Sequence, residues 1–252
     1  MLIHGMWMAS WIWDDMIAGL EQRGHRVTAL DLPGHGDHPT PLHRDLRVAD
    51  HVDFVAEQCR DVGGDRPLVL VGHSMGAAVA MHAAERVGAA GLVLVNPGPP
   101  RGVRIINRWS LPLMLTAIGP AAFRRSPAPL SEKQAHRMML HASPPPTAER
   151  IGAKLGSESP NTVRDVVWVL SPFRSAPDPR PLPTPTVVVA GTEDHIAPSA
   201  QILPAMSDWA GGAVDTVELN GVGHLAPVEV PSRMVGIIDG IATAACNSAA
   251  AT

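Results

Sequence analysis

The stretch RPLVLVGHSMGAAVAMHAAERVG, residues 66–88, joins a strand-forming run to a helix-forming run through a Gly-His-Ser-Met-Gly turn. A buried strand followed at once by a helix is half of a β-α-β unit, and repeated units of this kind build a parallel sheet covered by helices. The strand-like runs of the chain are Leu2–His4, Arg26–Leu30, Leu68–Val71, Gly91–Val95, Thr186–Ala190 and Asp215–Leu219. The sequence therefore predicts an α/β fold with a mostly parallel central sheet flanked by helices.

Helical patterns lie between these strands. Over Asp45–Val62 the apolar residues Val48, Val52 and Val55 recur on one stripe, which is typical of a helix packed on a sheet. Gly63 follows this segment, and Gly24 follows the helical pattern Trp13–Arg23, as is common at helix ends. The other helices predicted for the sheet layers are Trp13–Arg23, a helix that begins at Ser74, and Val230–Ala245.

The regular alternation breaks between Pro97 and Pro183, where proline is frequent. We expect residues 98–182 to form a helical cap over the strand ends, inserted into an α/β core of residues 1–97 and 183–252. This segment holds 12 basic and 5 acidic residues, a balance of +7, so the rest of the chain carries −11. Its predicted helices are Val103–Ile118, Ser131–His141, Thr147–Leu155 and Asn161–Leu170.

The composition limits what else the chain can be. With 252 residues and 45% hydrophobic content it can bury one large core. A net charge of −4 gives no reason to expect nucleic-acid binding, and no apolar run of about 18 residues predicts membrane insertion. Cys59 and Cys246 lack metal-ligand spacing and are too few for a disulfide framework, so we expect no metal and a reducing cytoplasm. The first residues also lack the basic start of a signal peptide.

Ser74 is the candidate nucleophile. Acyl transfer by an alcohol requires an exposed serine, a histidine that takes its proton, an acid that orients the histidine, and N–H donors for the oxyanion. In Gly-x-Ser-x-Gly between strand and helix, the serine sits on a strained turn, and Gly72 and Gly76 leave room for close packing. The alternative is that Ser74 only caps the helix. A matching acid and histidine downstream favour the nucleophile.

Asp194 and His224 are the predicted partners of the serine. Asp194 follows Thr186–Ala190, at the carboxyl end of a strand, where catalytic groups gather in open α/β folds. Glu193 competes for the same role. His224 lies in a glycine-rich loop after the last predicted strand. The chain order serine, acid, histidine distinguishes His224 from the other histidines.

The oxyanion donors are expected to be two backbone N–H groups. Met75 follows the serine, and Met6 follows the opening strand and Gly5. His4 is expected to be a structural hydrogen-bonding residue without a role in proton transfer. An apolar substrate pocket is expected to draw on large side chains, each of which is equally typical of core packing. The candidates are Trp7, Trp11, Trp109, Met114, Met138, Met139 and Trp168.

Taken together, His4-Gly5, Gly-His-Ser-Met-Gly, Gly-Thr-Glu-Asp and Gly-Val-Gly-His resemble the α/β-hydrolase superfamily across nearly the whole chain. The early stretch HGMWMASWIWDDMIAGLEQRGHRVTALDLPGHG is similar to the branch of plant methylesterases and hydroxynitrile lyases. In that branch the lyases carry a threonine after the first histidine and a lysine after the catalytic one, whereas this chain has Gly5 and Leu225. The resemblance therefore implies ester hydrolysis rather than cyanohydrin cleavage. Ser74 also disfavours the dehalogenases and epoxide hydrolases, whose relatives carry aspartate there.

Members of the superfamily usually have two strands before the His-Gly strand, whereas this chain begins three residues before His4. The resemblance implies a strand order of 4-3-5-6-7-8 in the family's numbering, with the first edge strands missing or residues upstream of Met1 unrecorded. An exposed sheet edge of this kind predicts a homodimer.

The sequence thus predicts a cofactor-free serine hydrolase that cleaves a small-molecule ester through an acyl-enzyme. A thioesterase is the alternative within hydrolysis, because the positive cap suits CoA- or carrier-protein-bound acyl chains and the serine motif resembles that of editing thioesterases. Otherwise the cap arginines simply pair with the acidic body. A cofactor-free lyase or cyclase, and a receptor without enzymatic activity, are the alternatives from other classes.

Overall fold

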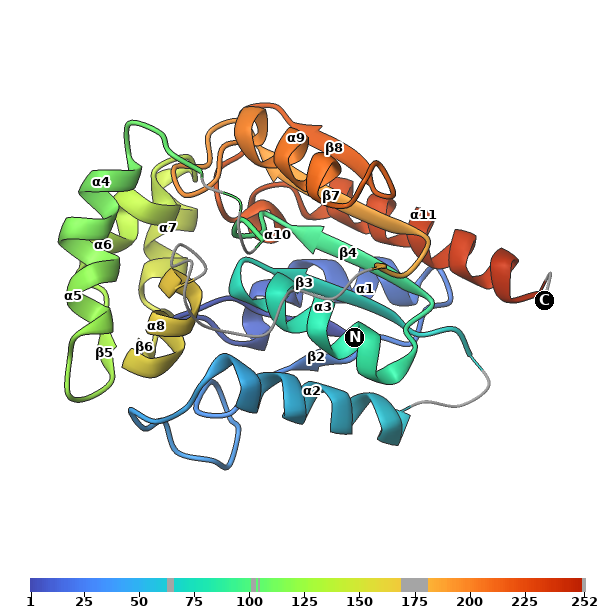
Figure 1. Ribbon diagram of the computed structural model, residues 1–252, viewed down its shortest axis with the longest axis horizontal. Helices are drawn as coiled ribbons and strands as arrows, with labels where there is room; N and C mark the ends of the chain where they lie inside the picture. The colour runs from blue at the N-terminus through green and yellow to red at the C-terminus, as the bar shows by residue number, and fades with distance from the viewer. Residues whose placement is uncertain (63–65, 101–102, 104, 169–180, 251–252) are drawn as a thin grey trace.

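The computed structural model describes residues 1–62, 66–100, 103, 105–168 and 181–250. Six strands form one sheet in the order β2-β1-β3-β4-β7-β8, and every neighbouring pair is parallel (Figure 1). Their bounds are β1 Leu2–Ile3, β2 Ala29–Leu30, β3 Val69–His73, β4 Gly91–Val95, β7 Thr186–Gly191 and β8 Asp215–Leu219. The predicted fold class is confirmed, and the strand order is the one implied by the resemblance.

The first two strands are shorter than predicted, and the third reaches further. Only Leu2 and Ile3 pair on both sides of β1, so His4 already belongs to the loop that follows. In β3 the pairing continues through His73, which lies opposite Val95. The sheet ends at β2 on one side, and a homodimer through that edge stays a prediction.

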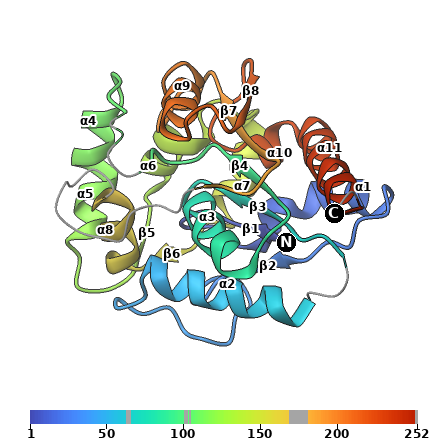
Figure 2. The ribbon, with the colours of Figure 1, turned by 45° about the vertical axis from the view of Figure 1, so that its right-hand side comes forward.

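Helices cover both faces of the sheet. α2 (Val48–Val62) packs on α3 (Met75–Val87), and α1 (Asp14–Glu21) packs on α11 (Pro231–Ala250), with the two pairs on opposite sides of the sheet (Figure 2). Two short helices complete these layers, a 3₁₀ turn at Ser10–Trp13 and α10 at Ala226–Glu229. α9 (Ser199–Trp209) was not predicted. Its interior Pro204 and the Ala-Pro-Ser before it are signals of a loop.

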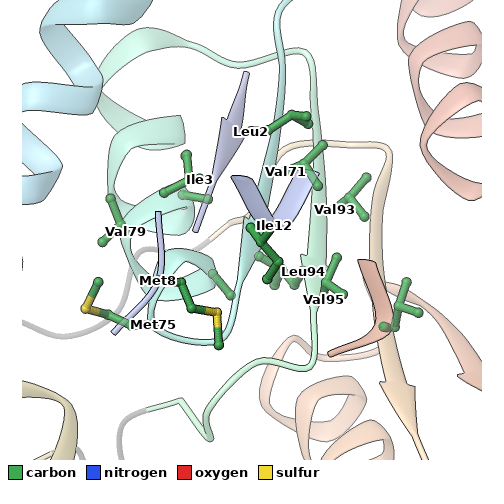
Figure 3. Close-up of a cluster of buried hydrophobic side chains, with 14 of the residues drawn as sticks. Leu2, Ile3, Met8, Ile12, Val71, Met75, Val79, Val93, Leu94 and Val95 are labelled. Carbon is green, nitrogen blue, oxygen red and sulfur yellow. The ribbon is translucent and has the colours of Figure 1, made fainter. Parts of the chain in front are cut away.

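The core lies where the central strands meet these helices. Val71, Val93 and Leu94 are almost fully buried, and their strands are nearly continuous apolar runs, because a parallel sheet is covered on both faces. Figure 3 shows residues of this core, with Leu2, Ile3, Val71, Val93, Leu94 and Val95 of the sheet beside Met8, Ile12, Met75 and Val79.

Glycine allows α3 to start directly against the sheet. A Cβ at Gly76 would lie 2.4 Å from the carbonyl oxygens of Ile3 and His4, and one at Gly72 would lie 2.2 Å from the Gly76 carbonyl oxygen. Such contacts are far inside van der Waals distance, so only glycine fits at either position. The close approach brings the end of β1 beside the turn that follows β3.

The described residues between β4 and β7, here called the helical segment, are mainly helical and lie beyond the carboxyl ends of the strands (Figure 1). The division into a core and a separate cap stays a prediction. The predicted helix over Val103–Ile118 begins only at Ser110, because the Asn107 side chain accepts a hydrogen bond from the Trp109 N–H and forms a local turn. The helical segments are α4 Ser110–Leu113, π-helical Met114–Ile118, α5 Gly119–Ala122, α6 Glu132–Ala135, π-helical His136–Leu140, α7 Pro145–Gly152 and α8 Pro160–Trp168.

A short antiparallel pair, β5 (Ala128–Pro129) and β6 (Ser157–Glu158), joins two parts of this segment and was not predicted. The end of the predicted helix Asn161–Leu170 lies outside the described residues. No helix in the described part of the chain is both long and apolar enough to cross a membrane.

Candidate active site

Ser74 lies on the turn between β3 and α3 in a backbone conformation that side chains rarely adopt. Its φ is 54° and its ψ is −120°. Such strain costs about 1–3 kcal/mol and persists only where the surroundings enforce it. Here the Ser74 N–H donates to the Val95 carbonyl, and the Ser74 carbonyl accepts from the Ala77 N–H. The Ser74 side chain makes no capping bond to α3, so the capping alternative is wrong.

The Ser74 hydroxyl instead faces His224. Ser74 Oγ lies 2.9 Å from His224 Nε2, and His224 Nδ1 lies 2.8 Å from Asp194 Oδ2. Asp194 comes from the loop after β7, and His224 comes from the loop after β8. Both side chains are almost fully buried, with exposed fractions of 0% and 2%. The structure therefore brings the three predicted residues into one hydrogen-bonded chain at the carboxyl edge of the sheet.

Asp194 is held as a carboxylate by several donors. The Ile196 and Ala197 N–H groups donate to Oδ1, at 2.8 and 3.3 Å. Burial alone would raise the pKa of Asp194, but His224 and these hydrogen bonds outweigh it, so the pKa of Asp194 is lowered. Glu193, the rival acid, is exposed to solvent. The geometry thus favours Asp194 as the partner of the histidine.

Asn96 is a site residue that the sequence analysis missed. Its side-chain amide donates to Asp194 Oδ2 at 3.0 Å and to the Gly223 carbonyl at 3.2 Å. It is fully buried and adopts a φ of 44°. The available signal was a polar residue directly after the apolar strand Gly91–Val95, at the sheet edge where functional groups gather.

His73 fixes the main chain of His224. His73 Nε2 lies 2.7 Å from the His224 carbonyl oxygen. Burial lowers the pKa of His73 to about 3, so the ring is neutral at physiological pH and its Nε2–H donates to that carbonyl. A histidine inside the serine motif was visible in the sequence, but its partner was not.

The Gly5-Met6 loop passes directly beside the serine. A Cβ at Gly5 would lie 2.9 Å from Ser74 Cβ and 3.2 Å from the His73 carbonyl oxygen. In the part of the chain that the structure describes, neither the Met6 N–H nor the Met75 N–H donates a hydrogen bond to another residue. Two unpaired donors next to a hydroxyl are suited to an oxyanion, although their role there stays a prediction.

His4 has the structural role expected of it. Its Nδ1 lies 2.8 Å from the Gly5 carbonyl oxygen, and its Nε2 accepts from the Leu32 N–H. Burial lowers the pKa of His4 to about 3. The ring is therefore neutral, with its proton on Nδ1, and it anchors the loop that follows β1.

The predicted pocket residues lie in different surroundings. Trp7 is 1% exposed, has a φ of 61°, and its indole donates to the Ala128 carbonyl. Trp109 stacks on His195, with ring centroids 4.1 Å apart, and His195 stacks in turn on His141. The side chains of Met114 and Trp168 lie outside the described part of the structure. Trp11 is partly buried, while Met138 and Met139 are buried core residues.

The stack joins the helical segment to the loop that carries Asp194. His141 Nε2 donates to the Glu193 carbonyl at 2.7 Å, and His195 Nδ1 donates to the Arg137 carbonyl at 2.8 Å. Trp109 therefore lies near the hydrogen-bonded chain through His195, the neighbour of Asp194. A contact between Trp109 and a substrate stays a prediction.

Among the described residues, no three His, Cys, Asp or Glu side chains are grouped as metal ligands. A serine on the turn between a strand and a helix, with an acid and a histidine on later loops of a parallel sheet, is typical of an α/β hydrolase. The chain belongs to the alpha/beta hydrolase family, which it matches over residues 1–237.

Relatives within this family include enzymes named as esterases. The chain is 36% identical over 75 residues to polyneuridine aldehyde esterase of Rauvolfia serpentina, covering 30% of this chain and 28% of that protein. It is 34% identical over 84 residues to Methylesterase 9 of Arabidopsis thaliana, covering 33% of each. The matched stretch thus spans only about a third of these relatives. An extracellular alpha/beta-hydrolase from a Paenibacillus species has a similar fold, with a TM-score of 0.74 at 18% identity over 95% of this chain and 97% of that one.

Proposed function

We propose that this protein hydrolyses carboxylic esters, with Ser74 as nucleophile, His224 as general base and acid, and Asp194 as the group that orients His224. The hydrogen-bonded chain from Ser74 Oγ through His224 to Asp194 carries this proposal. The relatives named as an esterase and a methylesterase support an ester as the substrate.

The hydrogen-bond distances support one placement of the protons. Buried Asp194 is an ionised acceptor, so His224 Nδ1 carries a proton and Nε2 is free to accept the proton of Ser74. Ser74 Oγ then attacks the ester carbonyl carbon, and the charge that develops on the carbonyl oxygen faces the N–H groups of Met6 and Met75.

The remaining steps reverse these roles. Protonated His224 gives its Nε2 proton to the leaving alkoxide, the C–O bond breaks, and the acyl group stays on Ser74. Water then enters, His224 takes its proton, and the hydroxide attacks the acyl-enzyme. Collapse of the second tetrahedral intermediate releases the acid, and His224 returns the proton to Ser74. No cofactor takes part in this scheme.

A fluorophosphonate probe tests the proposal directly. We expect intact-mass analysis to show one adduct per chain, peptide mapping to place it on Ser74, and turnover of para-nitrophenyl acetate to disappear in proportion to labelling. Labelling elsewhere, or turnover that survives complete labelling, would contradict the proposal. A panel of methyl esters, lactones and thioesters of different acyl length would then define the substrate class. A lyase, cyclase or receptor would label without hydrolysing any of them.

Anionic acyl substrates, including thioesters on CoA or an acyl carrier protein, are the second candidate. The observation that favours them is the balance of +7 over residues 98–182. Two of these basic side chains already form ion pairs with α1. Arg150 pairs with Asp15 at 3.3 Å, and Lys154 pairs with Asp14 at 3.7 Å. Arg108 instead lies over the Trp109 ring, 5.2 Å from its centroid, near the His195 stack.

Kinetics at different salt concentrations test this charge effect. We expect kcat/KM for an anionic ester to fall several-fold between about 0.02 and 0.5 M salt, while that for a neutral ester of equal length changes little. Arg108→Gln should lower the anionic preference, and Arg150→Gln, the matched control, should not. Charge-blind kinetics at all salt concentrations would exclude the steering effect.

A further inference from the structure

A carboxylate is buried between the helical segment and the sheet, away from the hydrogen-bonded chain of Ser74. Glu158, on β6, has a side chain with an exposed fraction of 0%. Its Oε2 accepts from the Trp7 N–H at 3.3 Å and lies 3.1 Å from His35 Nε2, and its Oε1 accepts from the Ser159 N–H. A buried carboxylate is costly unless it is paired, so these partners explain why it is tolerated.

His35 is the counter-charge of this carboxylate. Its Nε2 faces Glu158, and its Nδ1 lies 3.1 Å from the Pro33 carbonyl oxygen. Both partners only accept hydrogen bonds, so both ring nitrogens must carry a proton, which makes the ring an imidazolium. The His35 side chain is 2% exposed. The pair is therefore a charged, buried link between two parts of the chain that are 123 residues apart.

Three hydrogen bonds hold Trp7 to the residues of the short antiparallel strand pair β5–β6 and the adjoining Gly156. Its N–H donates to Glu158, its carbonyl accepts from the Gly156 N–H at 2.9 Å, and its indole donates to the Ala128 carbonyl at 3.2 Å. These contacts hold a tryptophan at a φ of 61°, which is rare for a side chain of this size. The strand pair β5–β6 thus fixes the peptide between Met6 and Trp7.

The peptide on the other side of Met6 is fixed from the sheet. The Gly5 carbonyl accepts from His4 Nδ1, and in a trans peptide the N–H of the next residue points the opposite way. The Met6 N–H therefore points away from His4. With both flanking peptides anchored, the direction of this N–H is set before any substrate binds.

We propose that Glu158 is a positioning residue which, through the Trp7 N–H, holds the Met6 N–H in place for the oxyanion. This inference rests on the proposed function and adds to it a link from the helical segment to the reacting centre. Preorganised donors are worth most where the charge develops, so a loosened Met6 peptide should weaken the transition state more than the bound substrate.

The other ionisable groups around the His35–Glu158 pair do not supply the positive charge that faces Glu158. The rings of His4 and His51 lie 5.2 and 5.8 Å from that of His35, and burial lowers their pKa values to about 3 and about 4, so both are neutral. Asp31 contributes a further negative charge at longer range. Burial alone would lower the pKa of His35, but Glu158, Pro33 and Asp31 outweigh it, so the pKa of His35 is raised. The stabilisation of the fold by the His35–Glu158 pair is then complete below the ordinary pKa of histidine. It is lost as the pH rises through the raised pKa of His35.

Glu158→Gln tests the role of the carboxylate, with Glu149→Gln, an exposed residue of α7, as the matched control. Active sites are first counted by fluorophosphonate, so that misfolded protein does not enter the rates. Per active site, we expect kcat for para-nitrophenyl acetate to fall roughly tenfold or more, with KM changed less than about twofold. Binding of trifluoroacetophenone, which forms a tetrahedral oxyanion adduct on serine, should weaken by the same factor as kcat/KM.

The pH profile gives a readout that a merely structural role would not move. Wild-type kcat should decline on the alkaline side as His35 loses its proton, and the variant should lack that decline. His35→Gln leaves Glu158 in place and should lose trifluoroacetophenone affinity too, so it carries the test if Glu158→Gln does not fold. A variant with lower thermal stability but unchanged kcat, inhibitor binding and pH profile would overturn the inference. If wild-type protein neither labels nor binds the inhibitor, the proposed function fails as well.

Discussion

Ser74→Ala is expected to lower kcat for activated esters by roughly four to six orders of magnitude. The alanine keeps the turn between β3 and α3 but removes the hydroxyl that we propose as the nucleophile, while His224 and the N–H groups of Met6 and Met75 stay in place. Rates should be measured with para-nitrophenyl acetate under single-turnover and steady-state conditions, together with fluorophosphonate labelling.

The fold of this variant should be unchanged, because the Ser74 hydroxyl hydrogen-bonds only to the His224 ring among the described side chains. Ser126→Ala, at an exposed position, is the matched control and should retain full activity. Circular dichroism and thermal unfolding would verify that both variants are folded. Full activity in a folded Ser74→Ala protein would remove the serine from the mechanism.

Asp194→Asn is expected to lower kcat/KM by roughly three to four orders of magnitude. An amide cannot act as an anionic acceptor for His224 Nδ1–H, so the histidine loses both its orientation and the charge that stabilises its protonated form. The neighbouring Asn96 amide worsens the effect, because its donor now faces a group that can itself be a donor. The ester assay used for Ser74→Ala measures this change.

Glu193→Gln provides the internal control for that experiment. Glu193 is the adjacent acid and is exposed to solvent. The variant should retain near-wild-type kcat/KM. The reverse pattern, with Glu193→Gln inactive and Asp194→Asn active, would transfer the orienting role to Glu193.

Much of the fold could be predicted because its signals are local. The valine-rich strands β3, β4 and β7 are nearly continuous apolar runs, and the amphipathic helix α2 shows its helical periodicity within a single run of residues. Predictions were wrong where a side chain bonded locally to the backbone, as Asn107 does before α4. α9 was missed because a proline in its second turn obscured its pattern.

The site likewise contains residues that local motifs predict and residues that only the folded structure brings together. Ser74, Asp194 and His224 carry motif and order, so they could be proposed without a structure. Asn96 and Glu158 act through partners that lie far away in the chain, and only the packed structure brings them together. The paired strands β5 and β6 have two residues each, too few for any period to appear in the sequence.

The tight packing of Gly5 against Ser74 limits how this protein can be redesigned or can diverge. The hydroxynitrile lyases that the sequence resembles carry threonine and lysine at positions that here hold Gly5 and Leu225. Any side chain at position 5 would have its Cβ 2.9 Å from Ser74 Cβ, and Leu225 is fully buried. Gly5→Thr and Leu225→Lys alone would therefore displace Ser74 and bury the lysine cation. A path from this chain to cyanohydrin chemistry must first move the loop after β1, so the proposed ester hydrolysis and cyanohydrin cleavage are separated by backbone geometry as well as by side chains.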